Sequence, residues 1–310
     1  MSLDPQAKTL LDYLEQSGLR DISTGSVQEA RESSANRKLP PGPPARVEDR
    51  NIDVPHGTVP VRIYRPLSGD CVGGVVYFHG GGFVLGSLDG HDAVCRQISV
   101  DAACTVVSVD YRLAPEHKFP AAVDDCVAAT RWVHAHALEL GFDRDRLAVA
   151  GDSAGATLAA VVAQLAKAAR TPPIVFQLLI YPVADLRSFE TPSYIENATG
   201  LFLTRDGMRW FADHYVRDDR DRHDPRCSLL ASSDLAGLPP ALIITAEHDP
   251  LRDEGEAYGE LLRRAGNHVT TSRYPGMIHA FVSLYAFLDA GRTALRECTT
   301  TLAAALRGDR

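Results

Sequence analysis

The chain has 310 residues, of which 45% are hydrophobic and 23% are charged. This balance is typical of a globular protein and excludes a disordered, collagen-like or coiled-coil chain, and the length suffices for one large domain or two ordinary ones. The formal net charge is −8, so the protein has no electrostatic reason to bind nucleic acid or an anionic membrane.

The cysteines and the amino terminus lead us to expect a soluble cytoplasmic protein. None of the six cysteines forms a Cys-x-x-Cys pair, and their density is far below that of a disulfide-stabilised scaffold. The first residues lack the charged start and apolar core of a signal peptide. The longest apolar run, around residues 158–163, is far shorter than the roughly 20 residues of a membrane helix, so we expect no stable membrane association.

Two helices and a linker are predicted before the first strand. Apolar residues at helical spacing predict a helix over residues 5–20, with Gly18 as a stop, and residues 26–37 are predicted to form a second short helix. The proline-rich run at residues 39–44 can form neither a helix nor a central strand, so it is predicted to be a linker.

Eight strand-like segments follow, and helical patterns separate most of them. A turn signal at His56 and Gly57 predicts that the first two strands form an antiparallel edge of the sheet. Helical patterns such as residues 121–140, 154–169 and 254–265 predict a mostly parallel sheet with helices on both faces. The predicted strands are residues 47–54, 59–64, 75–78, 105–109, 147–150, 174–180, 241–246 and 269–274.

Residues 186–235 interrupt this alternation. The segment is too long for one crossover connection and too rich in aromatic residues for a disordered loop, so we predict an inserted helical lid. The amino-terminal helices are expected to join it in space. The predicted division is therefore a helical cap from residues 1–45 and 186–235, and an α/β core from residues 46–185 and 236–310.

Residues 151–155 (Gly-Asp-Ser-Ala-Gly) match the pattern Gly-x-Ser-x-Gly. They directly follow the predicted strand 147–150 and directly precede a predicted helix that begins at Ala154, which is the context of a nucleophile elbow. Such a turn holds its serine in a strained backbone conformation above the sheet. The five residues alone could form an ordinary loop, but the strand before them and the helix after them favour Ser153 as a nucleophile.

Residues 79–82 (His-Gly-Gly-Gly) end another predicted strand. Successive glycines let backbone N–H groups approach a developing oxyanion, and the N–H of Ala154, just after the nucleophile, is a further donor. The run lacks the spacing and the Lys-Ser/Thr ending of phosphate-binding loops. We therefore predict an oxyanion hole and expect His79 to shape this loop rather than to act as a base or a ligand.

A serine nucleophile needs a base and an orienting carboxylate, which follow it in the chain order Ser, Asp or Glu, His for this type of elbow. Asp249 comes just after the predicted strand 241–246, and His279 comes just after the last predicted strand. Both are expected at the carboxyl edge of the sheet, so we predict His279 as the base and Asp249 as its partner. Asp185 also follows a strand and stays open as an alternative carboxylate.

The remaining candidates fit these roles less well. Asp253 is expected at the start of a helix, and His268 precedes its strand and so belongs to the opposite edge of the sheet. His248 adjoins Asp249 but has no role of its own in this pattern. His134 and His136 are two residues apart on a predicted helix and do not share a face, so no metal site is predicted there.

Taken together, these motifs resemble the hormone-sensitive-lipase family of esterases within the α/β-hydrolase superfamily. The resemblance covers about residues 45 to 305 and implies an α/β-hydrolase fold with a helical cap. A block at residues 111–116 also resembles the family, in a structural role. The motifs that carry the resemblance are residues 79–82, 151–155, 249–254 and 278–281.

The resemblance implies a serine carboxylesterase without a cofactor that acts on short- to medium-chain acyl esters, because the caps of such enzymes usually leave a narrow acyl pocket. Ser153 would be the nucleophile, His279 the base and acid, and Asp249 the residue that orients it. Many members of the family form dimers, which leaves a homodimer open. The implied oxyanion donors are the backbone N–H groups of Gly81, Gly82 and Ala154.

Other functions share these motifs and stay open. Amidases, lactonases and deacetylases use the same triad, and a non-catalytic small-molecule receptor or a lipase acting at oil interfaces could share the fold. The resemblance implies that His279 argues against a receptor, because the plant gibberellin receptors on this scaffold have lost that histidine. The charge-rich residues 217–224 argue against an interfacial lipase. The residues predicted to shape the substrate pocket are Phe83, Leu201, Phe202, Trp210 and Phe281.

Overall fold

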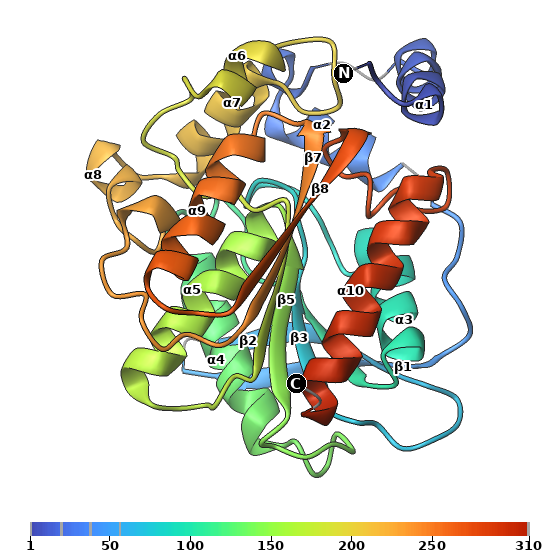
Figure 1. The fold of residues 1–310 in the computed structure, drawn as a ribbon, viewed down its shortest axis with the longest axis vertical. Helices are drawn as coiled ribbons and strands as arrows, with labels where there is room; N and C mark the ends of the chain where they lie inside the picture. Colours follow the sequence, from blue (N-terminus) through green and yellow to red (C-terminus); the bar gives the residue numbers. More distant parts are fainter. Residues whose placement is uncertain (1, 19–20, 37–38, 56, 309–310) are drawn as a thin grey trace.

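A sheet of eight strands runs through the centre of the computed structural model (Figure 1), which describes residues 2–18, 21–36, 39–55 and 57–308. The strand order is β1-β2-β4-β3-β5-β6-β7-β8. Strand β2 pairs antiparallel with both β1 and β4, and every other pair is parallel. The strands are β1 Arg46–Val54, β2 Gly57–Arg65, β3 Gly74–Phe78, β4 Thr105–Val109, β5 Leu147–Asp152, β6 Phe176–Ile180, β7 Ala241–His248 and β8 Val269–Ile278.

This arrangement confirms the predicted mostly parallel sheet with an antiparallel pair at one edge. All residues of the central strands β3, β4, β5 and β6 are buried, which explains why these strands are continuous apolar runs in the sequence. Alternate residues of β3 belong to two apolar cores, with Val76 and Phe78 in one and Val75 and Tyr77 in the other. The sheet therefore has a core on each face. The predicted turn residue His56 lies outside the described residues.

Helices cover both faces of the sheet (Figure 1). On one face lie α4 (Ala121–Ala135), α5 (Ala154–Ala169) and α9 (Arg252–Arg264), and on the other lie α3 (Asp92–Asp101) and α10 (Asp289–Arg307). Helix α5 has the predicted bounds, whereas α4 ends five residues early. The sequence analysis named neither α3 nor α10. Within the described part of the chain, no helix combines the length and the hydropathy that crossing a membrane requires.

Two helices precede the sheet, at Pro5–Gln16 (α1) and Val27–Ala35 (α2). The Asp4 carboxylate accepts the N–H of Gln6 at 2.8 Å and so caps α1, and a reciprocal capping box between Ser26 and Glu29 begins α2. Both helices lie within the predicted ranges, but α1 ends at Gln16 and α2 at Ala35, and residues 17–18 and 36 form turns. Residues 19–20 and 37 of the predicted ranges lie outside the described residues.

The insertion at residues 186–235 contains α6 (Pro192–Glu196), α7 (Arg205–Tyr215) and α8 (Asp219–Arg222). In Figure 1, α6 and α7 lie with α2 at the upper end of the sheet, towards which the arrows of β7 and β8 point, whereas α8 lies lower, beyond α9. A hydrogen bond of 2.6 Å from Thr204 Oγ1 to Asp21 Oδ2 joins the insertion to the amino-terminal segment. The later part of the insertion is tied to the core instead, for example by Lys167 Nζ and Asp234 Oδ1 at 2.6 Å.

Candidate active site

Ser153 lies in the turn between β5 and α5, at φ 55° and ψ −122°. This left-handed backbone conformation is strained for a side chain other than glycine, and it raises the serine above the end of the sheet. The turn needs glycine on both sides, because a Cβ on Gly151 would collide with the Gly155 carbonyl and one on Gly155 would collide with the Phe78 carbonyl. The Ser153 N–H donates to the Ile180 carbonyl at 2.8 Å, which holds the turn against β6.

Ser153, His279 and Asp249 form one continuous hydrogen-bonded chain. The distance between His279 Nε2 and Ser153 Oγ is 3.1 Å, and the distance between His279 Nδ1 and Asp249 Oδ2 is 2.7 Å. All three side chains are buried, and the other carboxylate oxygen of Asp249 accepts the N–H of Leu251 at 2.9 Å. Asp249 directly follows β7 and His279 directly follows β8, so three strand ends bring these side chains together.

The alternative carboxylates have other partners. Asp185 forms an ion pair with Arg187, and both of its oxygens accept hydrogen bonds from that guanidinium at 2.8 and 2.9 Å. Asp253 accepts the N–H of Ser193 at 2.8 Å. Within the described part of the chain, Asp249 is therefore the carboxylate that lies within hydrogen-bond distance of His279.

The glycine run after β3 forms a tight loop beside Ser153. Gly81, Gly82 and Phe83 have φ values of 121°, 60° and 64°, and the Gly81 carbonyl accepts the N–H of Leu85 at 2.8 Å. A Cβ on Gly82 would overlap the ring of Phe211, so only glycine fits there. The N–H groups of Gly81 and Gly82 donate no hydrogen bond within the described residues, and the same holds for Ala154, the first residue of α5. These three backbone N–H groups are thus free to donate to a ligand oxygen.

His79 supports this loop through contacts with Tyr111. Its buried ring stacks on Tyr111, with centroids 4.3 Å apart, and the Tyr111 hydroxyl donates to the His79 carbonyl at 2.7 Å. Burial, together with the nearby charge of His91, lowers the pKa of His79 to about 4. His79 is therefore neutral near pH 7, and its contacts are those of a residue that shapes the loop.

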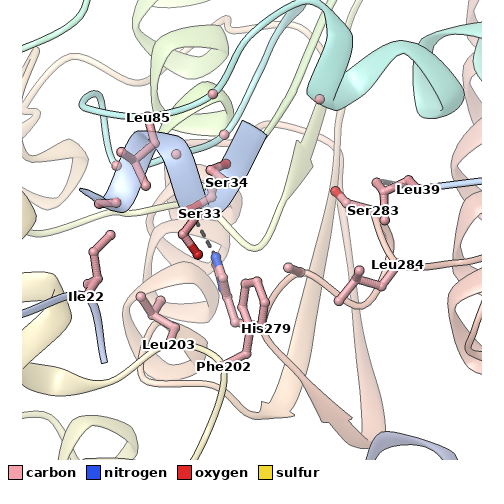
Figure 2. A pocket seen from close by; sticks show the side chains of 18 of the residues that line it. Ile22, Ser33, Ser34, Leu39, Leu85, Phe202, Leu203, His279, Ser283 and Leu284 are labelled. Carbon is pink, nitrogen blue, oxygen red and sulfur yellow. Dashed lines mark hydrogen bonds between the residues drawn. The ribbon is translucent and has the colours of Figure 1, made fainter. Parts of the chain in front are cut away.

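A cavity of about 1200 Å³ opens onto Ser153 and His279. Its walls include described residues between Leu3 and Pro41, residues of the loop after β3 and residues between Gly200 and Phe211 of the insertion. Figure 2 shows Leu203 on one side of His279, with Leu284 on the opposite side of the cavity. Segments that are distant in the sequence therefore enclose one space above the serine.

Of the five predicted pocket residues, Leu201 and Phe202 line this cavity. Phe83, Trp210 and Phe281 are not among the described residues that line it, so these three predictions are wrong. Phe83 stacks on Tyr215, at a centroid distance of 3.9 Å. Phe281 is fully buried in the core on one face of the sheet.

The error at Trp210 has a simple helical cause. On α7 the residues that line the cavity are Met208 and Phe211, three positions apart and therefore on one face of the helix. Trp210 lies on another face, where its ring packs against His214 with centroids 4.2 Å apart. Aromatic character identified the right helix but not the right residue.

The sequence analysis also missed Tyr181, which supports His279. The rings of these two residues lie with centroids 4.6 Å apart, and the Tyr181 hydroxyl is 3.1 Å from Ser283 Oγ, on the cavity wall. Tyr181 follows β6 directly and has a φ of 39°. The signal that could have found it is its position at a carboxyl strand end, which it shares with Ser153, Asp249 and His279.

Several known proteins that are similar to this chain are esterases. Residues 75–283 match a family model described as the alpha/beta hydrolase fold. The chain is 46% identical to carboxylesterase NlhH of Mycobacterium tuberculosis, over 98% of this chain and 96% of that protein. It is 37% identical to an arylesterase of Saccharolobus solfataricus, over 99% of each chain.

Solved structures of esterases superpose closely on the chain. A thermostable esterase of Pseudomonas putida has a TM-score of 0.93 at 40% identity, over 98% of each chain. An esterase of the archaeon Pyrobaculum calidifontis has a TM-score of 0.91 at 42% identity, over 98% of this chain and 99% of that one. The chain thus belongs to the α/β-hydrolase family and is a carboxylic ester hydrolase of the hormone-sensitive-lipase type.

Proposed function

We propose that this ester hydrolase works through an acyl-enzyme on Ser153. The observation that carries the proposal is the hydrogen-bonded chain from Asp249 through His279 to Ser153 Oγ, with distances of 2.7 and 3.1 Å. His279 Nε2 takes the proton of the hydroxyl as Oγ attacks the ester carbonyl, and it returns that proton to the leaving alcohol. Water then attacks the acyl-enzyme with the same help from His279, which releases the acid and restores the serine.

Asp249 holds the imidazole in the productive tautomer. Its Oδ2 accepts the Nδ1 hydrogen of His279, so Nε2 is left with the lone pair that removes the serine proton. The carboxylate also stabilises the imidazolium that forms during each step. Because its other oxygen is held by the N–H of Leu251, the carboxylate cannot rotate away from the ring without losing a hydrogen bond.

The oxyanion of the tetrahedral intermediate is proposed to bind the backbone N–H groups of Gly81, Gly82 and Ala154. None of them donates a hydrogen bond within the described residues; Gly81 and Gly82 lie on the loop after β3, and Ala154 is the first residue of α5. A preorganised donor of this kind stabilises the transition state by about 3 kcal/mol. Backbone donors also need no reorganisation when the charge develops.

Short- to medium-chain acyl esters are the proposed substrates. The cavity walls near Ser153 are apolar at Leu203, Met208 and Phe211, which suits an alkyl or aryl group. A relative from Pseudomonas putida, 38% identical over 93% of this chain, is an ethyl acetate hydrolase. The amino-terminal helices and the first part of the insertion are proposed to act as the cap over this cavity.

The decisive test of the nucleophile is Ser153→Ala. We expect turnover of an aryl acetate to fall by about 10⁵-fold or more, with an unchanged melting temperature and circular dichroism spectrum. An organophosphate should form one covalent adduct per chain of the wild type, measured by mass spectrometry, and none on this variant. Ser68→Ala, in an exposed loop, is the matched control and should label and turn over like the wild type. A Ser153→Ala protein that keeps more than about 1% of the rate contradicts the proposal.

The amidase, lactonase and deacetylase alternatives are tested by substrate. Rates on aryl esters of increasing acyl length are compared with those on a matched anilide and a lactone. We expect the ester rates to exceed the anilide and lactone rates by about 100-fold or more, because an anilide and a lactone both have poorer leaving groups than an aryl ester. Comparable rates on the anilide or lactone would assign the protein to one of those alternatives.

A further inference from the structure

The side chain of Asp152, the residue before the proposed nucleophile, links the two segments that carry the proposed oxyanion donors. Asp152 Oδ1 accepts the N–H of Gly80 at 3.0 Å and the hydroxyl of Tyr77 at 2.7 Å. The carboxylate is buried, and a Cβ on Gly80 would collide with its Oδ2. The glycine loop after β3 is therefore held directly against the turn after β5.

His91, whose Nε2 lies 3.3 Å from the Gly80 nitrogen, also contacts this buried carboxylate. Its Nε2 lies 3.3 Å from Asp152 Oδ1 and 3.4 Å from Oδ2. Burial by itself would raise the pKa of Asp152, but the charge of His91 and hydrogen bonds from His91 and Tyr77 outweigh it, so the pKa is lowered. Burial would lower the pKa of His91, and the Asp152 carboxylate outweighs it and raises the pKa. Each side chain therefore favours the charged form of the other.

The position of this pair links it to the reacting groups. Gly80 directly precedes Gly81, and Asp152 directly precedes Ser153, so the pair sets the separation between the loop donors and the nucleophile. Errors of about 1 Å in such a separation cost about 100-fold in rate. His91 lines the cavity at the start of α3, and it was not among the residues singled out in the sequence.

We propose that His91 is a positioning residue for ester hydrolysis: through its ion pair with Asp152 it holds Gly80 against the nucleophile turn and thereby fixes the oxyanion donors. This inference rests on the proposed function of Ser153 and the glycine loop. His79 also contacts Gly80, because its Nδ1 lies 2.8 Å from the Gly80 carbonyl oxygen. With its pKa lowered to about 4, His79 is neutral near pH 7.

The proposal is tested with His91→Ala and with His91→Gln, which can still donate a hydrogen bond to Asp152 but carries no charge. We measure kcat and KM on an aryl ester and the inhibition constant of an alkyl trifluoromethyl ketone. That ketone adds to Ser153 Oγ as a hemiketal, whose oxyanion occupies the same donors. For His91→Ala we expect kcat to fall by about 10- to 100-fold and the inhibitor to bind weaker by a similar factor, with KM within about threefold. His91→Gln should recover part of both losses.

The matched control is Arg96→Gln, which removes an ion pair with Asp92 on the same helix; Arg96 itself is not among the described residues that line the cavity. It should change stability without changing kcat or inhibitor affinity. If both His91 variants keep kcat and inhibitor affinity within about threefold of the wild type, or if only KM changes, the inference is wrong. Should His91→Ala fail to fold, His91→Gln decides by the same limits. An inactive Ser153→Ala beside unaffected His91 variants refutes this inference alone, whereas an active Ser153→Ala refutes the proposed function.

Discussion

Arg31 and Glu116, 85 residues apart in the sequence, face each other in a two-pronged ion pair with both N–O distances at 2.7 Å. The guanidinium also donates to the carbonyls of Val84 at 3.0 Å and Ala114 at 2.9 Å. Hydrogen bonds from Arg31 lower the pKa of Glu116 to about 2. Helix α2 is thus attached to the segment that follows the glycine loop. Arg31 therefore connects this helix to the chain next to the proposed oxyanion hole.

Replacing Arg31 should loosen α2 over the cavity. For Arg31→Gln we expect faster limited proteolysis within residues 26–36 and a fall of about 3- to 10-fold in kcat/KM, because the helix loses four hydrogen bonds to the core. Gln28→Ala, which removes only an exposed contact with Glu32 on the same helix, is the control. Equal proteolysis rates for the two variants would show that Arg31 does not hold the helix.

Asp249→Asn should lower kcat by about 10⁴-fold, because an amide favours the wrong tautomer of His279. The matched control is Asp185→Asn, which breaks an ion pair with Arg187 but touches no residue of the triad. It should keep kcat within about threefold. Steady-state kinetics on an aryl acetate, with melting temperatures for both variants, checks the pair. A loss below about tenfold for Asp249→Asn would point to another carboxylate.

Neighbouring residues on α7 should differ in their effect on chain-length preference. Phe211 lines the cavity beside Gly82, so Phe211→Leu should raise the rate on octanoyl relative to acetyl esters by about 3- to 10-fold. Trp210→Leu should leave this ratio unchanged, because Trp210 packs on His214 outside the cavity wall. The measurement is kcat/KM across aryl esters of increasing acyl length. Equal ratios for the two variants would show that Phe211 does not line the site that binds the acyl chain.

Glu254→Gln should make the protein more stable in alkaline solution. The carboxyl of Glu254 is buried, and burial raises its pKa well above the usual 4.5, although N–H groups of Ala184 and Asp185 oppose the shift. A raised pKa in the folded state gives stability that is complete below the unfolded pKa and is lost as the pH rises towards the folded pKa. The amide of the variant never ionises. Its oxygen can still accept the N–H of Ala184, which in the wild type lies 2.7 Å from Glu254 Oε1.

The melting temperature of Glu254→Gln relative to the wild type should therefore rise as the pH increases above the usual pKa of 4.5. Glu256→Gln serves as the control, since that carboxylate pairs with Arg273 near the surface. Its melting temperature relative to the wild type should stay level or fall over the same range. A Glu254→Gln difference that is flat with pH would mean that the buried carboxyl stays in one protonation state.

The sequence by itself determined the strands, the nucleophile turn and the order of the triad residues. These features are local: buried parallel strands are continuous apolar runs, and a turn as tight as residues 151–155 requires glycine at both ends. Asp249 and His279 could be chosen because each directly follows a strand, and the carboxyl ends of parallel strands meet at one edge. The fold and the three side chains that lie in hydrogen-bond contact therefore followed from pattern and order.

Only the tertiary structure decided what surrounds those three side chains. Whether Phe211 or Trp210 faces the cavity depends on the rotation of α7 against the core, which aromatic character does not encode. The pairs His91–Asp152 and Arg31–Glu116 join segments 61 and 85 residues apart, and a charged residue has many potential partners at such separations. Packing of the whole chain decides which of them come within hydrogen-bond distance, and a buried charge such as that of Asp152 is stable only where such partners offset the cost of burial.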